Sequence, residues 1–300
     1  MADPLRFDTI SFLSDYGLED EFVGVVHSVI RSLARGVHVL DVCHSVEPFN
    51  VRDGALTLAR ASLHLVPGVV LAVVDPGVGA GRKGVAIEVG DGQSYLVGPD
   101  NGLLAPAVAM VGGATGAVVL DNPDYQLPTH AVTFDGRDVF APAAAHLCNG
   151  VPLDELGTPV DPVQLVPGVM PVSEEQDDGT LAAEVLWIDR FGNVQLNVDP
   201  DQLSGWPETI EVQGGRESRV AQTVGTFAEI PSMTLGLLVD SYGLMAVAGH
   251  RESAASALGV AEADALVLRP VAGRPPARTT STESPVVFTT NPGPEAGPQR

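Results

Sequence analysis

The first half of the chain alternates between short apolar runs and segments with helical spacing. Residues 9–13 form an apolar run that stops at polar residues 14–17, and apolar side chains then recur every three or four positions over 22–33. A second segment with helical spacing covers 50–65, with Asn50 in position to cap it. Further apolar runs of β type lie at 37–42, 69–74, 85–89 and 94–97. Strands that alternate with helices predict an α/β domain, in which a mostly parallel sheet is flanked by helices.

The pattern changes after about Asp154, where Pro and Gly become frequent. The acidic stretch 173–179 is typical of a linker. Beyond it, short β-type segments follow one another without long helices between them, which predicts a small all-β domain, a barrel or a sandwich. These segments are 183–188, 193–198, 209–212, 235–239, 244–247 and 265–268.

These patterns divide the chain into four parts. We expect an α/β domain at 1–170, a linker at 171–180 and a smaller β-barrel-like domain at 181–270. The remainder, 271–300, consists largely of Pro, Thr, Ser, Gly and Arg. Such a composition cannot bury a core and predicts a disordered tail.

Acidity is the strongest feature of the composition, and it narrows the choice of partners. The chain carries 38 acidic side chains against 16 Lys and Arg, a formal net charge of −22. Nucleic acids and anionic membranes bind basic surfaces, so we expect neither as a partner. No apolar run approaches the ~20 residues of a membrane helix, and residues 1–7 lack the apolar run of a signal peptide. We therefore expect a cytoplasmic protein, with Cys43 and Cys148 as free thiols.

Acidic residues follow several of the predicted strands. Asp15 and Asp20 come after the first strand, Asp75 after another, and Asp189 after a strand of the second domain. Ligands of open α/β sheets bind at the carboxyl ends of strands, which favours a site here. Aspartates in these places also cap turns and helices, and the spacing alone leaves both readings open. The chain has no zinc signature, phosphate-binding loop or dinucleotide fingerprint, so the residues alone indicate only an acidic, glycine-lined site.

Five segments together resemble the S-adenosyl-L-methionine (SAM) hydrolase family that forms adenosine, whose relatives include the SAM-dependent fluorinase and chlorinase. The segments are LSDYGLED at 13–20, VDPGVG at 74–79, VGPDNGLL at 97–104, TFDGRDVFAP at 133–142 and IDRFGNV at 188–194. They stand in the family's order, and the resemblance covers about 9–268. It implies an α/β domain followed by a β-barrel. It also implies a homotrimer with active sites at the subunit interfaces, and SAM as the substrate without a further cofactor.

The resemblance implies binding roles for four residues around the nucleoside. Asp15 matches the carboxylate that holds the ribose hydroxyls, and a carboxylate can accept from both groups of a vicinal diol. Asn193 matches the residue that reads adenine, with an amide donor and a carbonyl acceptor. Phe49 and Phe227 match positions that pack on the nucleoside.

Four further matches surround the methionine part. Asp20 and Asp189 match positions that meet the ammonium group, where charge-assisted hydrogen bonds are expected. Ser241 matches a residue near the carboxylate. Tyr242 stands where the halogenases have Arg, so the recognition of the carboxylate at this position differs.

Asp75 and Arg82 favour hydrolysis over halogenation. The halogenases carry Tyr at the position of Asp75, and a carboxylate there repels a halide ion in a site of low dielectric constant. It accepts a hydrogen bond from water instead, while Arg82 keeps it ionised. Gly136 also lacks the hydroxyl that the fluorinase offers to its halide.

Asp135 completes the predicted catalytic group, although hydrolases of this family usually carry His in its place. It can accept a hydrogen bond from Arg82 or share a proton with Asp75. The sequence thus predicts hydrolysis of SAM to adenosine and L-methionine by in-line attack of water at the ribose C5′ carbon. Two alternatives stay open: a 5′-halogenase and a non-catalytic sensor of SAM or adenosine.

Overall fold

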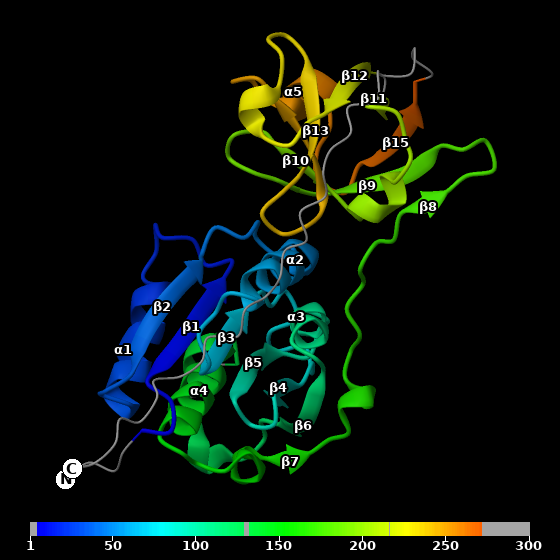
Figure 1. Cartoon of the computed structure of the whole chain (residues 1–300). Helices are drawn as coiled ribbons and strands as arrows, with labels where there is room; N and C mark the ends of the chain where they lie inside the picture. Colours follow the sequence, from blue (N-terminus) through cyan, green and yellow to red (C-terminus); the bar gives the residue numbers. More distant parts are fainter. Residues whose placement is uncertain (1–4, 129–131, 216, 272–300) are drawn as a thin grey trace, which may run out of the picture.

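The computed structural model describes residues 5–128, 132–215 and 217–271. An α/β domain comes first along the chain and a β-barrel second, which confirms the predicted fold class (Figure 1). The predicted tail lies, apart from Val271, outside the described residues. In the described part, no helix is long and apolar enough to cross a membrane.

The sheet of the first domain has the strand order β2-β1-β3-β5-β4-β6-β7. Its strands are β1 (Thr9–Ser14), β2 (His38–Cys43), β3 (Val69–Val73), β4 (Gly84–Val89), β5 (Ser94–Pro99), β6 (Ala114–Val119) and β7 (Thr158–Pro159). Strands β2, β1, β3 and β5 pair in parallel, whereas β4, β6 and β7 pair antiparallel. The turn at 90–93 is too short for a crossover helix, so β4 and β5 form a hairpin.

Helices cover both faces of this sheet, as predicted. They are α1 (Phe22–Leu33), α2 (Val51–Ser62), α3 (Ala105–Met110) and α4 (Ala141–Cys148), with a π-helical turn η2 (Gly136–Phe140) leading into α4. Strand β3 is buried on both faces: Leu71 packs in the core cluster that includes residues of α1 and α4, and Ala72 in the cluster that includes residues of α2 and α3. The Asn50 side chain accepts a hydrogen bond from the backbone N–H of Asp53 at 3.0 Å, which confirms the predicted cap of α2.

Seven strands of the second domain form a closed barrel, because β10 pairs with both β14 and β9. They are β9 (Leu181–Ile188), β10 (Val194–Leu196), β11 (Thr209–Gly214), β12 (Glu217–Thr223), β13 (Leu235–Val239), β14 (Met245–Gly249) and β15 (Ala265–Pro270). A short helix, α5 (Ala254–Leu258), packs on the barrel core. Part of the predicted linker contributes to this sheet, since β8 (Glu174–Glu175) pairs with β9.

Short 3-10 turns complete the chain. They are η1 (Pro123–Tyr125), η3 (Leu153–Leu156), η4 (Pro162–Gln164), η5 (Pro200–Leu203) and η6 (Phe227–Glu229).

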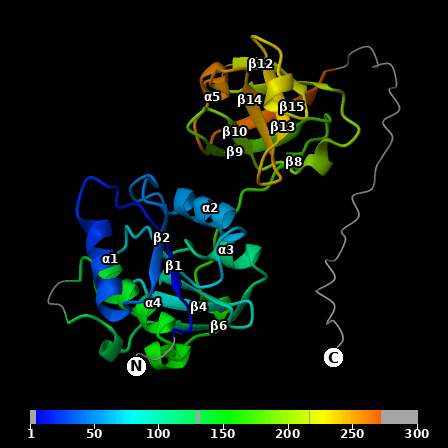
Figure 2. The same cartoon turned by 60° about the vertical axis from the view of Figure 1, so that its left-hand side comes forward.

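Helix α2 faces the barrel in both views (Figures 1 and 2). Arg52 of α2 forms an ion pair with Glu184 of β9. The Arg60 guanidinium, further along α2, lies 4.3 Å from the centre of the Trp187 ring of β9. The two arginines therefore connect the domains through one strand of the barrel.

Candidate active site

Two neighbouring strands bring the first acidic residues together. Strands β1 and β3 pair in parallel, so their carboxyl ends meet at one edge of the sheet. Asp15 follows β1, and its backbone N–H donates to the carbonyl of Val73, the last residue of β3. Asp75 comes two residues later. The strand ends thus place both carboxylates on one cavity.

The cavity has a volume of about 250 Å³ and is lined by five segments of the first domain. They are the loop after β1, the start of α1, the loop before α2, the end of β3 with the turn that follows it, and the segment that leads into η2. Four predicted site residues line it: Asp15, Phe49, Asp75 and Asp135. The structure therefore gathers these four residues, which lie far apart in the sequence, around one space.

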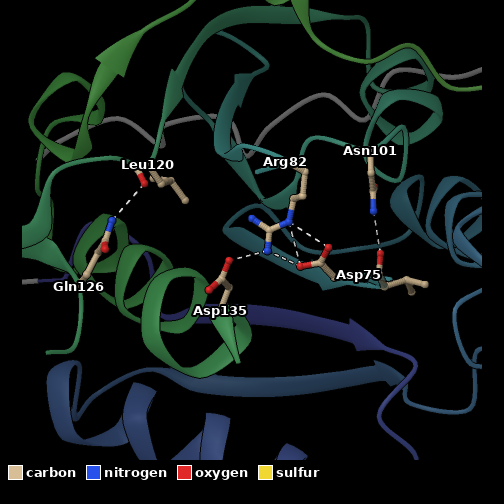
Figure 3. A network of polar contacts seen from close by, with 7 residues as sticks. Asp75, Arg82, Asn101, Leu120, Gln126 and Asp135 are labelled. Atoms are coloured by element: carbon tan, nitrogen blue, oxygen red, sulfur yellow. Dashed lines mark hydrogen bonds and ion pairs between the residues drawn. The ribbon is translucent and has the colours of Figure 1, made fainter. Parts of the chain in front are cut away.

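Arg82 joins the two carboxylates that were predicted to orient water (Figure 3). Its Nε atom lies 2.9 Å from each carboxylate oxygen of Asp75, and its Nη2 atom lies 2.6 Å from Oδ2 of Asp135. Nη2 also donates to Asp75. The three side chains are only 6% (Asp75), 13% (Arg82) and 19% (Asp135) exposed. The predicted hydrogen bond between Arg82 and Asp135 is thus present.

The residues around Arg82 favour its charged form. Burial acts against the charged guanidinium, but the hydrogen bonds and charges of Asp75 and Asp135 outweigh it and raise the pKa of Arg82. The guanidinium also lies 5.0 Å from the centre of the Phe140 ring. A permanent cation therefore stands between two carboxylates in a mostly dry setting.

Asn101 holds the strand end that carries Asp75. Its side-chain N–H donates to the carbonyl of Val74 at 2.9 Å (Figure 3). Its side-chain oxygen accepts from the backbone N–H of Leu103 at 3.1 Å. The sequence assigned no role to the VGPDNGLL segment at 97–104. In the structure, its Asn101 fixes the turn that carries Asp75.

Asp15 positions Phe49 on the opposite wall. Its carboxylate accepts the backbone N–H of Phe49 at 2.9 Å, and Phe49 has a φ of 68°, in the left-handed region. Burial raises the pKa of Asp15, as does the charge of Asp75, while the hydrogen bond from Phe49 opposes this rise. Asp15 is thus a desolvated acceptor beside an exposed aromatic ring.

Tyr16 is a wall residue that the sequence reasoning did not single out. Its ring stacks edge-on against Phe134 with the ring centres 5.6 Å apart. A Cβ atom at Gly136 would lie 2.0 Å from the Tyr16 hydroxyl oxygen, so the hydroxyl fills the space that a side chain there would need. Burial, together with the charges of the site carboxylates, raises the pKa of Tyr16, which stays neutral. The only feature of the sequence that could have indicated Tyr16 as a site residue was its position directly after Asp15.

Asp189 and Asn193 form a tight polar pair in the barrel. The side-chain amide of Asn193 donates to Oδ2 of Asp189 at 2.7 Å, and Oδ1 of Asp189 accepts the backbone N–H groups of Phe191 and Asn193, both at 2.9 Å. The carboxylate therefore closes the turn between β9 and β10 and fixes the amide of Asn193.

The other predicted residues lie apart from the first cavity. Asp20 is exposed in the loop before α1, Ser241 is exposed in a turn, and Phe227 is 54% exposed on η6. Tyr242 lines a second cavity of about 810 Å³ between α2 and the barrel, and its ring lies edge-on to Trp187 at 6.2 Å. Within the described residues of one chain, the barrel residues Asp189, Asn193, Phe227, Ser241 and Tyr242 do not line the cavity around Asp75.

Comparison with known proteins agrees with this architecture. The family model for the N-terminal domain of SAM hydroxide adenosyltransferase matches residues 10–157, and that for the C-terminal domain matches residues 183–267. The chain is 45% identical over 257 residues to an (R)-S-adenosyl-L-methionine hydrolase of Salinispora tropica, covering 86% of this chain and 96% of that protein. It is 41% identical to the protein of the same name from Thermus thermophilus, covering 84% and 96%.

More distant relatives and a solved structure extend the comparison. A fluorinase of Actinopolyspora mzabensis is 30% identical over 226 residues, covering 68% of this chain and 75% of that protein. The crystal structure of an uncharacterized conserved protein from Thermotoga maritima superposes with a TM-score of 0.79 at 32% identity, covering 86% of this chain and 99% of that one. With both domains matched in order and the relatives covered almost end to end, the chain belongs to the SAM hydroxide adenosyltransferase family.

Proposed function

We propose that this protein hydrolyses SAM to adenosine and L-methionine. The observation that carries the proposal is Arg82 bound to Asp75 and Asp135 at a cavity that Asp15 also lines. Relatives that are 41–45% identical bear the name (R)-S-adenosyl-L-methionine hydrolase, which supports the same reaction and the same sulfonium epimer here.

In the proposed reaction, water attacks the ribose C5′ carbon in line with the departing sulfur. The C5′–O bond forms as the C5′–S bond breaks, and the electron pair of that bond turns the sulfonium into the neutral thioether of methionine. Asp75 accepts a hydrogen bond from the water and aims its oxygen at C5′. The proton that water loses passes to the carboxylate pair of Asp75 and Asp135 and from there to solvent.

The low exposure of these side chains favours the reaction. A hydroxide-like oxygen that approaches a sulfonium cation neutralises charge, so a site with little water stabilises the transition state relative to the ground state. A halide ion in the same place meets two carboxylates instead. We therefore propose water, and not a halide, as the nucleophile.

Substrate binding is proposed to involve two subunits. Asp15 accepts hydrogen bonds from the ribose hydroxyls, Phe49 packs on the nucleoside, and Asp20 meets the methionine ammonium. Asp189, Asn193, Phe227, Ser241 and Tyr242 come from the barrel of a neighbouring subunit. A homotrimer with sites at its interfaces supplies that neighbour, since these residues and Asp75 do not share a cavity in one chain.

The remaining features of the proposal follow from charge and chemistry. SAM brings its own leaving group, so we propose that the chemical step uses no cofactor and no metal ion. The net charge of −22 supports a small-molecule enzyme with no nucleic-acid or membrane partner. We place the enzyme in the cytoplasm.

The test is turnover of SAM in water enriched in ¹⁸O. We expect adenosine that carries the heavy oxygen at its 5′ position, methionine that carries none, and consumption of the (R) sulfonium epimer from an epimeric mixture. Reactions with and without chloride or fluoride should run at the same rate. SAM that stays intact, or a 5′-halo nucleoside as the product, would overturn the proposal.

A further inference from the structure

Two histidines and an aspartate converge next to the loop that carries Asp15. His27 belongs to α1, Asp41 to β2, and His44 follows β2 directly. Oδ1 of Asp41 lies 2.8 Å from Nε2 of His27 and 3.0 Å from Nε2 of His44. None of the three lines the cavity around Asp75, so the proposed reaction leaves them without a role.

The three side chains have the chemistry of a metal site. Their ligand atoms, two imidazole nitrogens and a carboxylate oxygen, all lie within 4.8 Å of one another. Two imidazoles with one carboxylate suit divalent ions of the zinc class, which take three protein ligands and leave a further position to water. His44 is buried, while 34% of His27 and 46% of Asp41 are exposed, so an ion and its water have access from solvent.

A second contact orients one of the ligands. Oγ of Ser14 lies 2.8 Å from Nδ1 of His44, on the ring edge that faces away from Asp41. Histidines that bind a metal through one nitrogen usually donate a hydrogen bond from the other, and the hydroxyl of Ser14 can accept it. The Phe12 ring, 4.6 Å away between centres, packs edge-on against the His44 imidazole and holds its plane.

We propose that His27, Asp41 and His44 bind one divalent transition-metal ion of the zinc class through Nε2, Oδ1 and Nε2, with water completing its coordination. To bind, each imidazole carries its proton on Nδ1, and in His44 this proton points at Ser14. The ion takes no part in the hydrolysis.

The place of the cluster gives the ion a structural effect on the active site. Oγ of Ser14 also accepts the backbone N–H of Tyr16, and the carbonyl of His44 accepts the backbone N–H of Gly17. An ion at His44 therefore stiffens the loop 14–17, on which Asp15 stands. We expect it to raise the thermal unfolding temperature of the protein and to tighten SAM binding.

The test is metal binding by the full chain, made without a histidine tag and freed of metal with a chelator. Titration with Zn²⁺ in a calorimeter should show one saturable site, and Co²⁺ should give visible absorption bands of a low-coordinate site with nitrogen ligands. His27→Gln and Asp41→Asn should weaken Zn²⁺ binding by roughly tenfold or more, since even partners outside the ligand set are worth that much. His64→Gln, which changes an exposed histidine outside the cluster, is the matched control.

Two results would overturn the inference: no saturable binding of Zn²⁺ or Co²⁺, or binding that His27→Gln and Asp41→Asn leave as strong as His64→Gln does. Circular dichroism of the chelator-treated variants shows whether each is folded. His27 is partly exposed on its helix, so its substitution leaves the core in place. The readout is ion binding itself. A protein that fails to hydrolyse SAM can therefore still pass this test, and an active one can fail it.

Discussion

The hydroxyl of Tyr16 occupies the space beside Gly136, 2.0 Å from where a Cβ atom of residue 136 would lie. The two residues come from two different segments that line the cavity, the loop after β1 and the start of η2. A glycine at position 136 is therefore what allows the tyrosine ring to stand in the wall. Because Asp15 and Asp135 are the direct neighbours of these two residues, their contact also sets the spacing of the site.

Gly136→Ser should lower the rate of SAM hydrolysis, because the new side chain displaces the Tyr16 ring. The shift reaches Asp135, and a misplacement of about 1 Å near reacting groups costs on the order of a hundredfold. Steady-state kinetics measure the loss. The double variant Gly136→Ser with Tyr16→Phe removes the clashing hydroxyl and should recover part of the rate; equal rates for the single and double variants would count against the steric explanation.

Asp75→Asn should reduce kcat by roughly a hundredfold or more while SAM still binds, because the amide keeps the shape but accepts no proton. Single-turnover rates and calorimetry separate chemistry from binding. Asp154→Asn, a change at an exposed acid of η3, is the control and should retain full activity. If Asp75→Asn kept wild-type kcat, this carboxylate would have no part in aiming water.

Arg82→Met should lower the free energy of unfolding by about 3 kcal/mol at neutral pH, because it leaves two buried carboxylates without their cation. Urea unfolding at neutral pH measures this deficit. Arg82→Lys keeps a cation and should lie between the wild type and Arg82→Met, whereas a lysine variant as unstable as the methionine variant would point to lost packing instead.

Asp15→Asn should stabilise the protein at neutral pH and weaken SAM binding. Burial raises the pKa of Asp15, so the folded state holds this proton more tightly than the unfolded state. The contribution of Asp15 to the free energy of unfolding is therefore fully present at low pH and is lost as the pH rises from 3.8 through the raised pKa. Asparagine carries no charge, so Asp15→Asn should regain this contribution at pH 7.

The asparagine keeps an acceptor for the N–H of Phe49 but lacks the charge that strengthens the proposed hydrogen bonds to ribose. We expect SAM affinity to fall about tenfold to a hundredfold. Thermal unfolding at pH 7 and calorimetric titration with SAM give the two readouts. A variant less stable than the wild type would contradict this prediction. It would mean that the hydrogen bond from Phe49 to the charged carboxylate stabilises the fold by more than the burial of that charge destabilises it.

If the sites are shared between subunits, as proposed, two inactive variants should complement each other. Asp75→Asn removes the proposed catalytic carboxylate of the first domain, and Asn193→Ala removes the proposed adenine-binding amide of the barrel. Coexpressed at equal levels in a cyclic trimer, they should form intact sites by chance in about a quarter of the interfaces. Activity of the mixed trimers near that fraction, against little activity of either parent, is the expected result; no recovery in verified mixed trimers would place both residues in sites of one chain.

The features of the fold that depend only on residues close together in the sequence could be predicted from it. The apolar run at 69–74 predicted a strand, and the burial of both its faces in the structure explains why it lacks polar positions. Asn50 predicted the start of α2 because an N-cap depends only on neighbours in sequence. The pairing direction of β4 was not predictable from hydrophobicity, since it is set by the tight turn at 90–93.

Part of the candidate site could likewise be predicted from the sequence, and part of it could not. Aspartates after strands are visible in the sequence, and parallel pairing brings Asp15 and Asp75 together. The contact of Tyr16 with Gly136 joins residues distant in the sequence and depends on how the wall folds. The cluster of His27, Asp41 and His44 has no regular spacing, because a helix and a strand supply its members separately.

Phe49 illustrates how the wall of the pocket is arranged by the protein itself. Its backbone is held in an uncommon conformation by the Asp15 carboxylate, so the aromatic wall stands in place while only one carboxylate oxygen is engaged. A nucleoside that binds as proposed meets a stacking partner that is already arranged, so little loop entropy is lost on binding. In that binding mode one carboxylate serves both the aromatic wall, through the N–H of Phe49, and the ribose hydroxyls, which ties recognition of the sugar to the placement of the ring.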